Sequence, residues 1–291
     1  FVAFNSIICA GGSILFHKNF IPADVMAALV KVTMLMGVPT HYIRLTAEKS
    51  LSKQNTNKIR LFISGSAPLS AEIHSQFKQK TNFSILERYG MTETNMISSN
   101  PYEGKRKPGT VGLPLPGVSV RIRDIKTGKI LEKGAIGSIE VKGANVFKGY
   151  WKLKKRNNLD FQSDGFFITG DLGFFDSAGY LNISGRQKDL IISGGFNVYP
   201  AEVEHVVDAL AEVNESAIIG VPHPDYGEGV TAVITLNDGW LTIDETDLKN
   251  RLRNELASFK VPLKIKVKKQ LPKNTMGKIQ KNLLRDEYKK I

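Results

Sequence analysis

Residues 185–200 read GRQKDLIISGGFNVYP, and this stretch divides the chain. A charged turn at 186–189 leads into a short apolar run, which ends at a double glycine. Pro200 then opens a helix, because proline suits the first helical position. Arg186 offers a rigid fork of donors to hydroxyls or phosphates, and the glycines allow close approach of a ligand to the backbone. The stretch therefore predicts a junction between two domains, with the charged turn as a hinge.

The bulk properties fit a soluble two-domain protein. A chain of 291 residues is long enough for two domains, and no apolar run reaches the roughly 18 residues of a membrane span. Cys9 is the one cysteine, and its apolar surroundings predict a buried, inert thiol in a reducing compartment. Residues 1–5 lack a basic n-region and an initial Met, so we expect the interior of a domain there. Bacterial cytoplasm and mitochondrial matrix both fit.

The net charge of +12 is concentrated at one end of the chain. Residues 260–291 contain eleven basic and two acidic residues. Such a patch suits nucleic acid, or a solvated face that attracts phosphate-bearing small ligands. We favour the second interpretation and expect no nucleic-acid partner, because the segment lacks both interleaved aromatics and a DNA-reading motif.

The pattern before the junction changes once. A helix over 23–36, a strand over 59–63, a small-residue turn, a helix over 71–80 capped by Ser70, and a strand over 84–87 ending in a loop form a βαβ rhythm. Ligands collect at the carboxyl ends of strands in such sheets. Alternating runs then predict an antiparallel β subdomain, with strands over 118–123, 137–142 and 165–169.

The residues after the junction predict a small α+β domain of about 100 residues, a size that can hold its own core. We expect helices over 200–210 and 244–258 and strands over 215–221, 230–236 and 263–267. The predicted fold is therefore α/β, with a large domain over 1–187 and a mobile C-terminal domain over 188–291. The five histidines show no ligand-like spacing.

Residues 89–93, Tyr-Gly-Met-Thr-Glu, form the sharpest local motif. A glycine lets the chain turn past a ligand, and the Thr92 hydroxyl can bond a phosphate or carboxylate oxygen. Glu93 can hold Mg²⁺, a hard cation that prefers oxygen. From these residues alone, a capped loop explains the motif equally well.

These features together resemble the adenylate-forming acyl-CoA synthetases over the whole chain. The resemblance rests on the 185–200 junction, the 89–93 motif, the loop at 100–104 and the tail segment 274–278, and it is strongest to malonyl-CoA synthetases. It implies an ATP-dependent acid–CoA ligase that works through an acyl-adenylate and releases AMP and pyrophosphate. ATP, Mg²⁺ and coenzyme A are the implied cofactors and cosubstrates.

The resemblance also implies roles for individual residues. Thr92 contacts phosphate, Glu93 coordinates Mg²⁺, and Lys278 reaches the carboxylate and the α-phosphate during adenylation. Lys188 is the hinge about which the small domain rotates between the two half-reactions. The implied ATP-binding residues are Gly65, Ser66, Ala67, Pro68, Glu87, Arg88, Tyr89, Gly90, Met91, Thr92, Asp171, Arg186 and Lys278. The implied CoA-binding residues are Ser193, Gly194 and Gly195.

Two arginines indicate the chemical class of the acid substrate. Arg44 and Arg88 fall close to positions that line the acyl pocket in these synthetases, and the resemblance also implies substrate binding by Met91. An arginine there suits an acyl group with a second carboxylate, because the pair is bidentate, whereas an unpaired buried charge is costly. We therefore expect malonate or methylmalonate. The alternatives are a medium-chain or aryl acyl-CoA ligase, a carrier-loading adenylation domain, or a non-catalytic nucleotide- or CoA-binding module.

One element of the resemblance is missing. The Ser/Thr/Gly-rich loop that binds phosphate in these synthetases does not occur in the sequence, nor does any Walker-type loop. We therefore expect the chain to be a fragment that lacks the N-terminal part of the large domain, and the activity to belong to the full-length parent.

Overall fold

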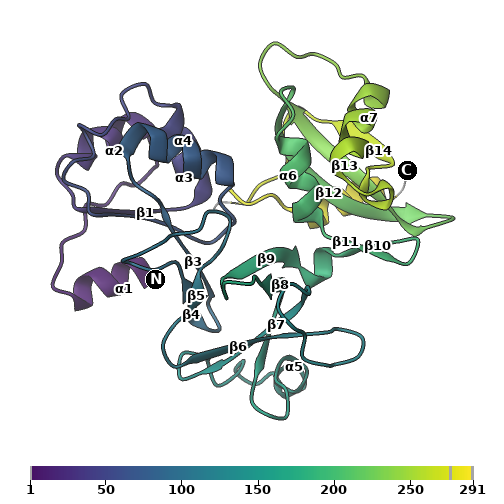
Figure 1. Ribbon diagram of the computed structural model, residues 1–291, viewed down its shortest axis with the longest axis horizontal. Coiled ribbons are helices and arrows are strands. Elements are labelled where there is room, and N and C mark those ends of the chain that lie inside the picture. The colour runs from purple at the N-terminus through teal and green to yellow at the C-terminus, as the bar shows by residue number, and fades with distance from the viewer. Residues whose placement is uncertain (1, 275–276, 290–291) are drawn as a thin grey trace. The chain divides into compact units, whose positions relative to one another are not determined.

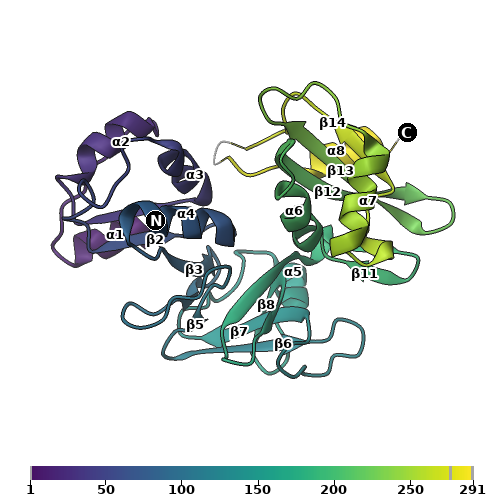
Figure 2. The same ribbon diagram turned by 45° about the horizontal axis from the view of Figure 1, so that its top comes forward.

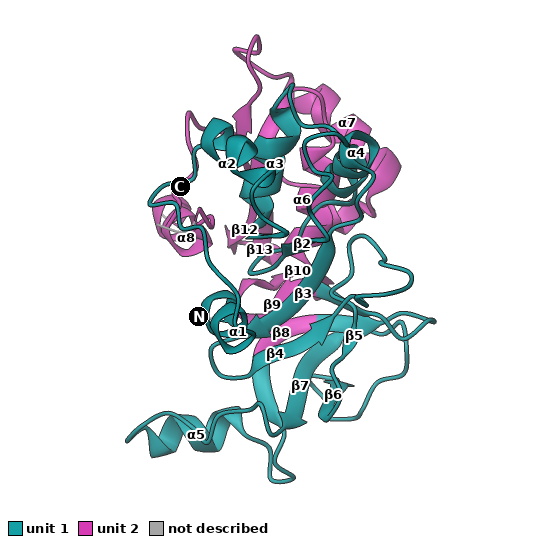
Figure 3. Ribbon diagram, turned by 90° about the vertical axis from the view of Figure 1, so that its left-hand side faces the viewer, with its two compact units in different colours: residues 1–169, 173–183 teal, residues 170–172, 184–291 magenta. Residues whose placement is uncertain are grey.

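The computed structural model describes residues 2–274 and 277–289, so Thr275 and Met276 of the tail motif lie outside the described residues. The chain divides into two compact units. Unit 1 comprises residues 1–169 and 173–183, and unit 2 comprises residues 170–172 and 184–291 (Figure 3). The boundary at 187/188 stays a prediction. The mixed α/β class that the sequence predicts is confirmed.

Unit 1 begins with helices around a five-stranded sheet in the order β1-β2-β3-β4-β5. Strands β1, β2 and β3 are parallel, whereas β4 and β5 join antiparallel. The elements are α1 (Val2–Cys9), α2 (Pro22–Leu29), β1 (Met34–Gly37), α3 (Pro39–Ala47), β2 (Leu61–Ser64), α4 (Ala71–Thr81), β3 (Leu86–Met91), β4 (Asn95–Ser99) and β5 (Leu113–Pro114).

The alternation along β2 divides the apolar residues between the two faces of this sheet. Phe62 packs with residues of α2, α3 and α4, which gather beside the strands (Figures 1 and 2). Leu61 and Ile63 join a separate cluster with Leu86. Helix α4 begins as predicted, because the Ser70 side chain accepts the backbone N–H of Ile73 at 3.2 Å. The parallel βαβ core is thus confirmed.

Three local predictions for unit 1 are wrong. The helix expected over 23–36 ends at Leu29, and Met34–Gly37 forms β1, because its backbone pairs with β2. The loop expected after residue 87 is instead the continuation of β3 to Met91. Cys9 is exposed rather than buried, because α1 has no buried residue among those described.

The predicted antiparallel subdomain is present, but the strand expected over 165–169 spans Phe167–Phe175, and the strand Leu181–Arg186 was not predicted. A four-stranded sheet runs in the order β6-β7-β8-β9, and β6 pairs antiparallel with β7. Its strands and accompanying helix are β6 (Val118–Arg123), β7 (Gly137–Gly143), α5 (Lys154–Asp160), β8 (Phe167–Phe175) and β9 (Leu181–Arg186).

Unit 2 is built on a second five-stranded sheet, in which β11-β10-β13-β12 are consecutive and β14 pairs with β13. Its elements are the 3-10 turns Gln187–Asp189 and Ser258–Lys260, the strands β10 (Ile191–Ser193), β11 (Phe196–Val198), β12 (Val213–His223), β13 (Gly227–Leu236) and β14 (Lys264–Val267), and the helices α6 (Pro200–Asp208), α7 (Glu245–Glu255) and α8 (Lys281–Tyr288).

Both faces of this sheet are covered. Ile218 of β12 packs with residues of α6 and α7, whereas its neighbour Ile219 packs with Leu284 and Tyr288 of α8. The sequence prediction missed β11 and α8. Three-residue β11 is too short for a clear periodicity, and the basic charge of the tail obscures the apolar side of α8. No helix in the described part of the chain is long and apolar enough to cross a membrane.

A buried carboxylate fastens two loops of unit 1. Glu87, on β3, is only 5% exposed and accepts the backbone N–H groups of Gly109, at 3.2 Å, and of Leu69. Burial raises the pKa of Glu87 to about 7, although both backbone hydrogen bonds lower it. The side chain of Asn100 holds the same loop by donating to the carbonyl oxygen of Thr110 at 2.8 Å. Glu87 thus joins the 68–70 turn and the loop around Gly109 to one strand.

We predict that Glu87→Gln changes how stability depends on pH. The pKa of Glu87 rises on folding from 4.5 to about 7, so the folded state binds the proton more tightly than the unfolded chain. The free energy of unfolding of the wild type therefore falls as the pH rises through that window, by about 3 kcal/mol in total. The uncharged glutamine lacks this dependence, so the variant gains stability relative to wild type between pH 4.5 and 8.

Urea unfolding at several pH values checks this prediction. Glu72→Gln is the control, because Glu72 is exposed on α4, and it should follow the wild-type pH profile. A Glu87→Gln variant whose profile runs parallel to that of the wild type would show that Glu87 does not carry the effect.

Candidate functional site

The first group of predicted site residues lies at the carboxyl end of β2 and along the adjacent β3 in unit 1. Ser64 pairs with Glu87 across the two parallel strands, so the residues that follow them are neighbours. A Cβ added at Gly65 would lie 3.5 Å from the carbonyl oxygen of Arg88. Ser66 has a positive φ of 71°, and the turn that it forms with Ala67 and Pro68 is exposed. This edge is where ligands bind in open α/β sheets.

Arg88 is a partly buried cation. Its Nη2 lies 3.8 Å from the sulfur of Met36 on β1, and burial lowers its pKa, an effect that Tyr42 opposes. Tyr42 is fully buried on α3 and donates its hydroxyl to the carbonyl oxygen of Ile63 at 2.7 Å. Among the described residues, no carboxylate forms an ion pair with Arg88. A guanidinium in this state is suited to an anionic ligand, because charge left unpaired in a partly buried place is costly.

Arg44 lies on the same helix as Tyr42 but is exposed. Burial lowers the pKa of His41 on the same helix, and the positive charge of Arg44 lowers it further. The ring of His41 stacks on Phe20 with 4.0 Å between the ring centroids. Arg44 forms no ion pair with the described residues. The structure does not bring it into contact with Arg88, so its role at the acid stays a prediction.

The 89–93 motif spans the end of β3 and the turn to β4. Tyr89, Gly90 and Met91 are strand residues, whereas Thr92 is exposed on the turn. Gly90 has no substitute, because a Cβ there would lie 2.0 Å from the carbonyl oxygen of Asn95. The motif therefore places Thr92 at the carboxyl end of β3, beyond Arg88 on the same strand.

Glu93, the predicted Mg²⁺ ligand, is partly buried on this turn. The hydroxyl of Tyr150 donates to its Oε1 at 2.9 Å, and burial, followed by the bond to Glu93, raises the pKa of Tyr150 to about 12. No group of three or more metal-binding side chains occurs among the described residues. One carboxylate nevertheless fits Mg²⁺ that arrives on ATP, because Mg²⁺ commonly takes one or two carboxylates and completes its shell with phosphates and water.

The second group lies in unit 2. Nε of Arg186 contacts Oδ1 of the buried Asp171 at 2.9 Å. Loss of solvent around the ammonium group lowers the pKa of Lys278, and the charge of Arg186 lowers it further, whereas Asp171 opposes the shift. Two cations and one carboxylate thus share a small region with a net positive charge. Such a region suits a phosphate group.

The backbone of Lys278 is hydrogen-bonded to Asn274 in the C-terminal tail. Lys273 and Ile279 form a β-bridge, and the N–H of Lys278 donates to Oδ1 of Asn274 at 2.9 Å. The N–H of Gly277 donates to the carbonyl oxygen of Asn274 at 2.9 Å. These contacts hold the backbone of Lys278 in place.

The predicted CoA-binding residues form a hairpin between β10 and β11. Ser193 pairs with Phe196, so Gly194 and Gly195 are its two loop residues, with φ values of 56° and 84°. A two-residue turn with two positive φ angles is the type I′ turn, which requires glycine or asparagine. The turn geometry therefore accounts for both glycines, and contact with CoA stays a prediction.

The predicted hinge residue Lys188 is exposed, and its neighbours are held on both sides. Arg186 pairs with Asp171, and Asp189 accepts an ion pair from Arg285 of α8 at 2.8 Å. Both contacts lie within unit 2. The role of Lys188 as a hinge stays a prediction.

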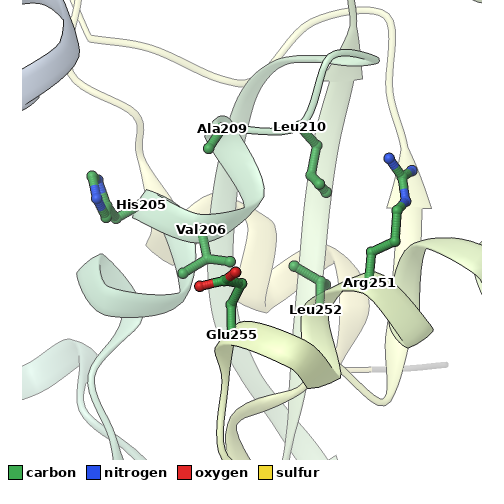
Figure 4. Close-up of a pocket in the computed structure, with 7 residues that line it drawn as sticks. All are labelled: His205, Val206, Ala209, Leu210, Arg251, Leu252 and Glu255. Carbon is green, nitrogen blue, oxygen red and sulfur yellow. The ribbon is translucent and has the colours of Figure 1, made fainter.

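A groove between α6 and α7 is separate from these groups. It has a volume of about 320 Å³ and includes His205, Arg251 and Glu255 (Figure 4). Arg251 is already paired there with Asp247, at 3.1 Å, and with Glu212. None of the predicted site residues lines this groove.

Sequence reasoning missed two tyrosines. Tyr42 interacts electrostatically with Arg88, and the hydroxyl of Tyr150 donates a hydrogen bond to Glu93. Each is distant in sequence from its partner, and Tyr150 lies 57 residues from Glu93. The signal that could have indicated Tyr150 is its position beside Gly149, in a loop between two predicted strands.

Comparisons with known proteins identify the family of the chain. The family model described as AMP-binding enzyme matches residues 1–151, and that of the AMP-binding enzyme C-terminal domain matches residues 202–278. A long-chain-fatty-acid–CoA ligase of Yersinia pestis is 37% identical over 89% of this chain and 46% of its own length. A mitochondrial malonate–CoA ligase of Bos taurus is 36% identical over 89% of this chain and 49% of its own length.

The chain is also similar to solved structures. The crystal structure of ATP-bound MatB from Rhodopseudomonas palustris is 55% identical, with a TM-score of 0.96, over 99% of this chain and 57% of that chain. The chain therefore spans about half the length of the relatives that it matches. Because the two family models together match residues on both sides of the junction, the chain belongs to the family of AMP-binding enzymes.

Proposed function

We propose that the protein is an ATP-dependent acid–CoA ligase that makes malonyl-CoA or methylmalonyl-CoA through an acyl-adenylate. The observation that carries this proposal is Arg88, a partly buried guanidinium for which no described residue supplies a carboxylate. A dicarboxylic acid supplies that carboxylate and keeps its second one free to react. Guanidinium matches carboxylate in a bidentate geometry.

The relatives support this substrate class. Malonate–CoA ligases of Arabidopsis thaliana and Bos taurus are 35% and 36% identical to the chain. Other relatives at similar identity are named for long-chain fatty acids or for feruloyl-CoA. An apolar acyl group would leave Arg88 without a partner, so the alternative of a medium-chain or aryl ligase is less consistent with this side chain.

We propose nucleotide-binding roles for individual residues of each group. The 65–68 turn, with Arg88 and Tyr89, lines the adenine and acyl parts, and Thr92 donates its hydroxyl to a phosphate oxygen. Asp171 accepts the ribose hydroxyls, with Arg186 beside it. The Glu87 carboxylate is committed to two backbone N–H groups, so its contribution is to hold the 68–70 turn.

Glu93 is the residue that would hold Mg²⁺, which when bound neutralises phosphate charge. Lys278 stabilises the charge that develops on the α-phosphate, because a fixed cation is most effective where charge appears in the transition state. In this step a carboxylate oxygen of the acid bonds to the α-phosphorus, and the bond from that phosphorus to the bridging oxygen breaks, releasing pyrophosphate.

In the second step the sulfur of CoA bonds to the acyl carbon and AMP leaves, while the thiol proton passes to water. We propose that CoA approaches along the 193–195 turn, and that motion about Lys188 exchanges Lys278 for this turn between the two steps. One lysine on a mobile lobe can then serve adenylation without obstructing the thiol.

The acid is tested by replacing Arg88. We predict that Arg88→Met lowers pyrophosphate exchange with malonate by about 100-fold, because a buried carboxylate loses its charged partner. Arg60→Met is the matched control, since Arg60 is exposed and its Nη1 donates to the hydroxyl of Tyr102 at 3.4 Å. The assay uses full-length protein and a panel of dicarboxylic, medium-chain and aryl acids. Undiminished exchange with malonate in Arg88→Met, or a wild-type preference for an apolar acid, contradicts the proposed substrate.

The catalytic lysine is tested separately. We predict that Lys278→Ala lowers the rate of adenylation by about 100-fold or more and leaves the affinity for ATP within a few-fold, because the lysine acts mainly on charge that appears during the reaction. Lys269→Ala, at an exposed lysine of the same tail, should retain full activity. Full adenylation activity in Lys278→Ala would contradict the catalytic role of Lys278, whereas absence of adenylation in the wild type would favour a non-catalytic nucleotide-binding module.

A further inference from the structure

Tyr150 holds one oxygen of the Glu93 carboxylate. Its hydroxyl donates to Oε1 at 2.9 Å, and both side chains are partly buried. A carboxylate has two oxygens with several acceptor sites. The hydroxyl therefore restricts the rotation of the carboxylate while Oε2 stays available for another ligand.

The position of Tyr150 is itself fixed by α5. The Asn157 side chain bonds the Tyr150 backbone twice: its Oδ1 accepts the N–H at 2.7 Å and its Nδ2 donates to the carbonyl oxygen at 3.0 Å. The ring of Tyr150 also packs edge-on against Phe147, with 4.9 Å between the centroids. A side chain that is held at both its backbone and its ring can set the orientation of its partner.

The same segment also holds the backbone of Glu93. The N–H of Phe147 donates to the Glu93 carbonyl oxygen at 2.8 Å. Glu93 is thus fixed at two points, its carbonyl oxygen and its carboxylate, by residues 147 and 150. This double attachment exceeds what is needed to close the turn between β3 and β4, which already has the hydrogen bond from the N–H of Thr94 to Met91.

We propose that Tyr150 is a positioning residue that orients the Glu93 carboxylate toward the metal of the bound MgATP, with Asn157 setting the position of Tyr150. This inference rests on the proposed function, in which Glu93 holds that metal. Hydrogen bonds from outside the coordination shell commonly orient a metal ligand in this way. The Tyr150 hydroxyl makes no contact with substrate in this scheme.

The test measures metal binding directly. Mn²⁺ replaces Mg²⁺, and its binding to full-length protein in the presence of ATP is followed by electron paramagnetic resonance. We expect Tyr150→Phe to weaken Mn²⁺ binding by about tenfold, and Asn157→Ala to weaken it in the same direction. The concentration of Mg²⁺ that gives half-maximal pyrophosphate exchange should rise in parallel, with KM for CoA unchanged.

Tyr180→Phe is the matched control, because Tyr180 lies in the same unit and donates its hydroxyl to the carbonyl oxygen of Lys105 at 2.8 Å. It loses one hydrogen bond of the same kind without touching Glu93, and its Mn²⁺ affinity should equal that of the wild type. Thermal unfolding of all variants separates lost metal affinity from lost stability. Unchanged Mn²⁺ affinity in Tyr150→Phe, or an equal loss in Tyr150→Phe and Tyr180→Phe, overturns the proposal.

Failure of the Tyr150 proposal can be distinguished from failure of the proposed function. If no acid supports pyrophosphate exchange in the wild type, the proposed reaction is wrong, yet Mn²⁺ binding with ATP still reports on Tyr150 and Glu93. If exchange occurs and Tyr150→Phe binds Mn²⁺ like the wild type, the reaction stands and the role of Tyr150 does not.

Discussion

The pairing of β2 with β3 is the constraint on which the site in unit 1 depends. Because Ser64 faces Glu87 across these parallel strands, the next residues, Gly65 and Arg88, must lie side by side. Shifting this register by one residue would turn Arg88 to the other side of the sheet. The apolar residues of β2 prevent such a slip, since Phe62 is committed to the helices and Ile63 to the opposite cluster. The position of the charged residue therefore follows from the packing of its uncharged neighbours.

The loops at this edge are held by polar groups rather than by apolar contact. Glu87 bonds the backbone of the 68–70 turn and of the loop at Gly109, and Tyr150 bonds the carboxylate of Glu93. Each of these bonds joins segments that are distant in sequence. Buried polar contacts of this kind specify one geometry, because a partly buried group that loses its partner is costly. Both contacts thus limit how far the loops can move while the sheet stays intact.

The sequence could predict elements that carry a local signal. Ser70 with the helix after it, the alternating strands of the β subdomain and Pro200 at the start of α6 all appear where expected. Met34–Gly37 was assigned to a helix, because its strand form depends on pairing with β2. The exposed state of Cys9 and the contact of Tyr150 with Glu93 are equally non-local. Motif residues could therefore be located in the sequence, whereas the residues that hold them could not.

The structure shows how many of the basic side chains in the C-terminal tail form ion pairs, which the sequence alone does not. Six of its basic side chains form ion pairs with carboxylates in the described part of unit 2: Lys260, Lys268, Lys273, Lys281, Arg285 and Lys289. Much of the excess positive charge of the tail is thus neutralised by carboxylates in ion pairs, which weakens the case for a broad nucleic-acid surface. Lys278 is different, because it shares its surroundings with a second cation, Arg186, and with Asp171. A lysine placed beside another cation gains more from an arriving phosphate than one that already has a carboxylate. This arrangement supports the role proposed for Lys278 at the nucleotide phosphate.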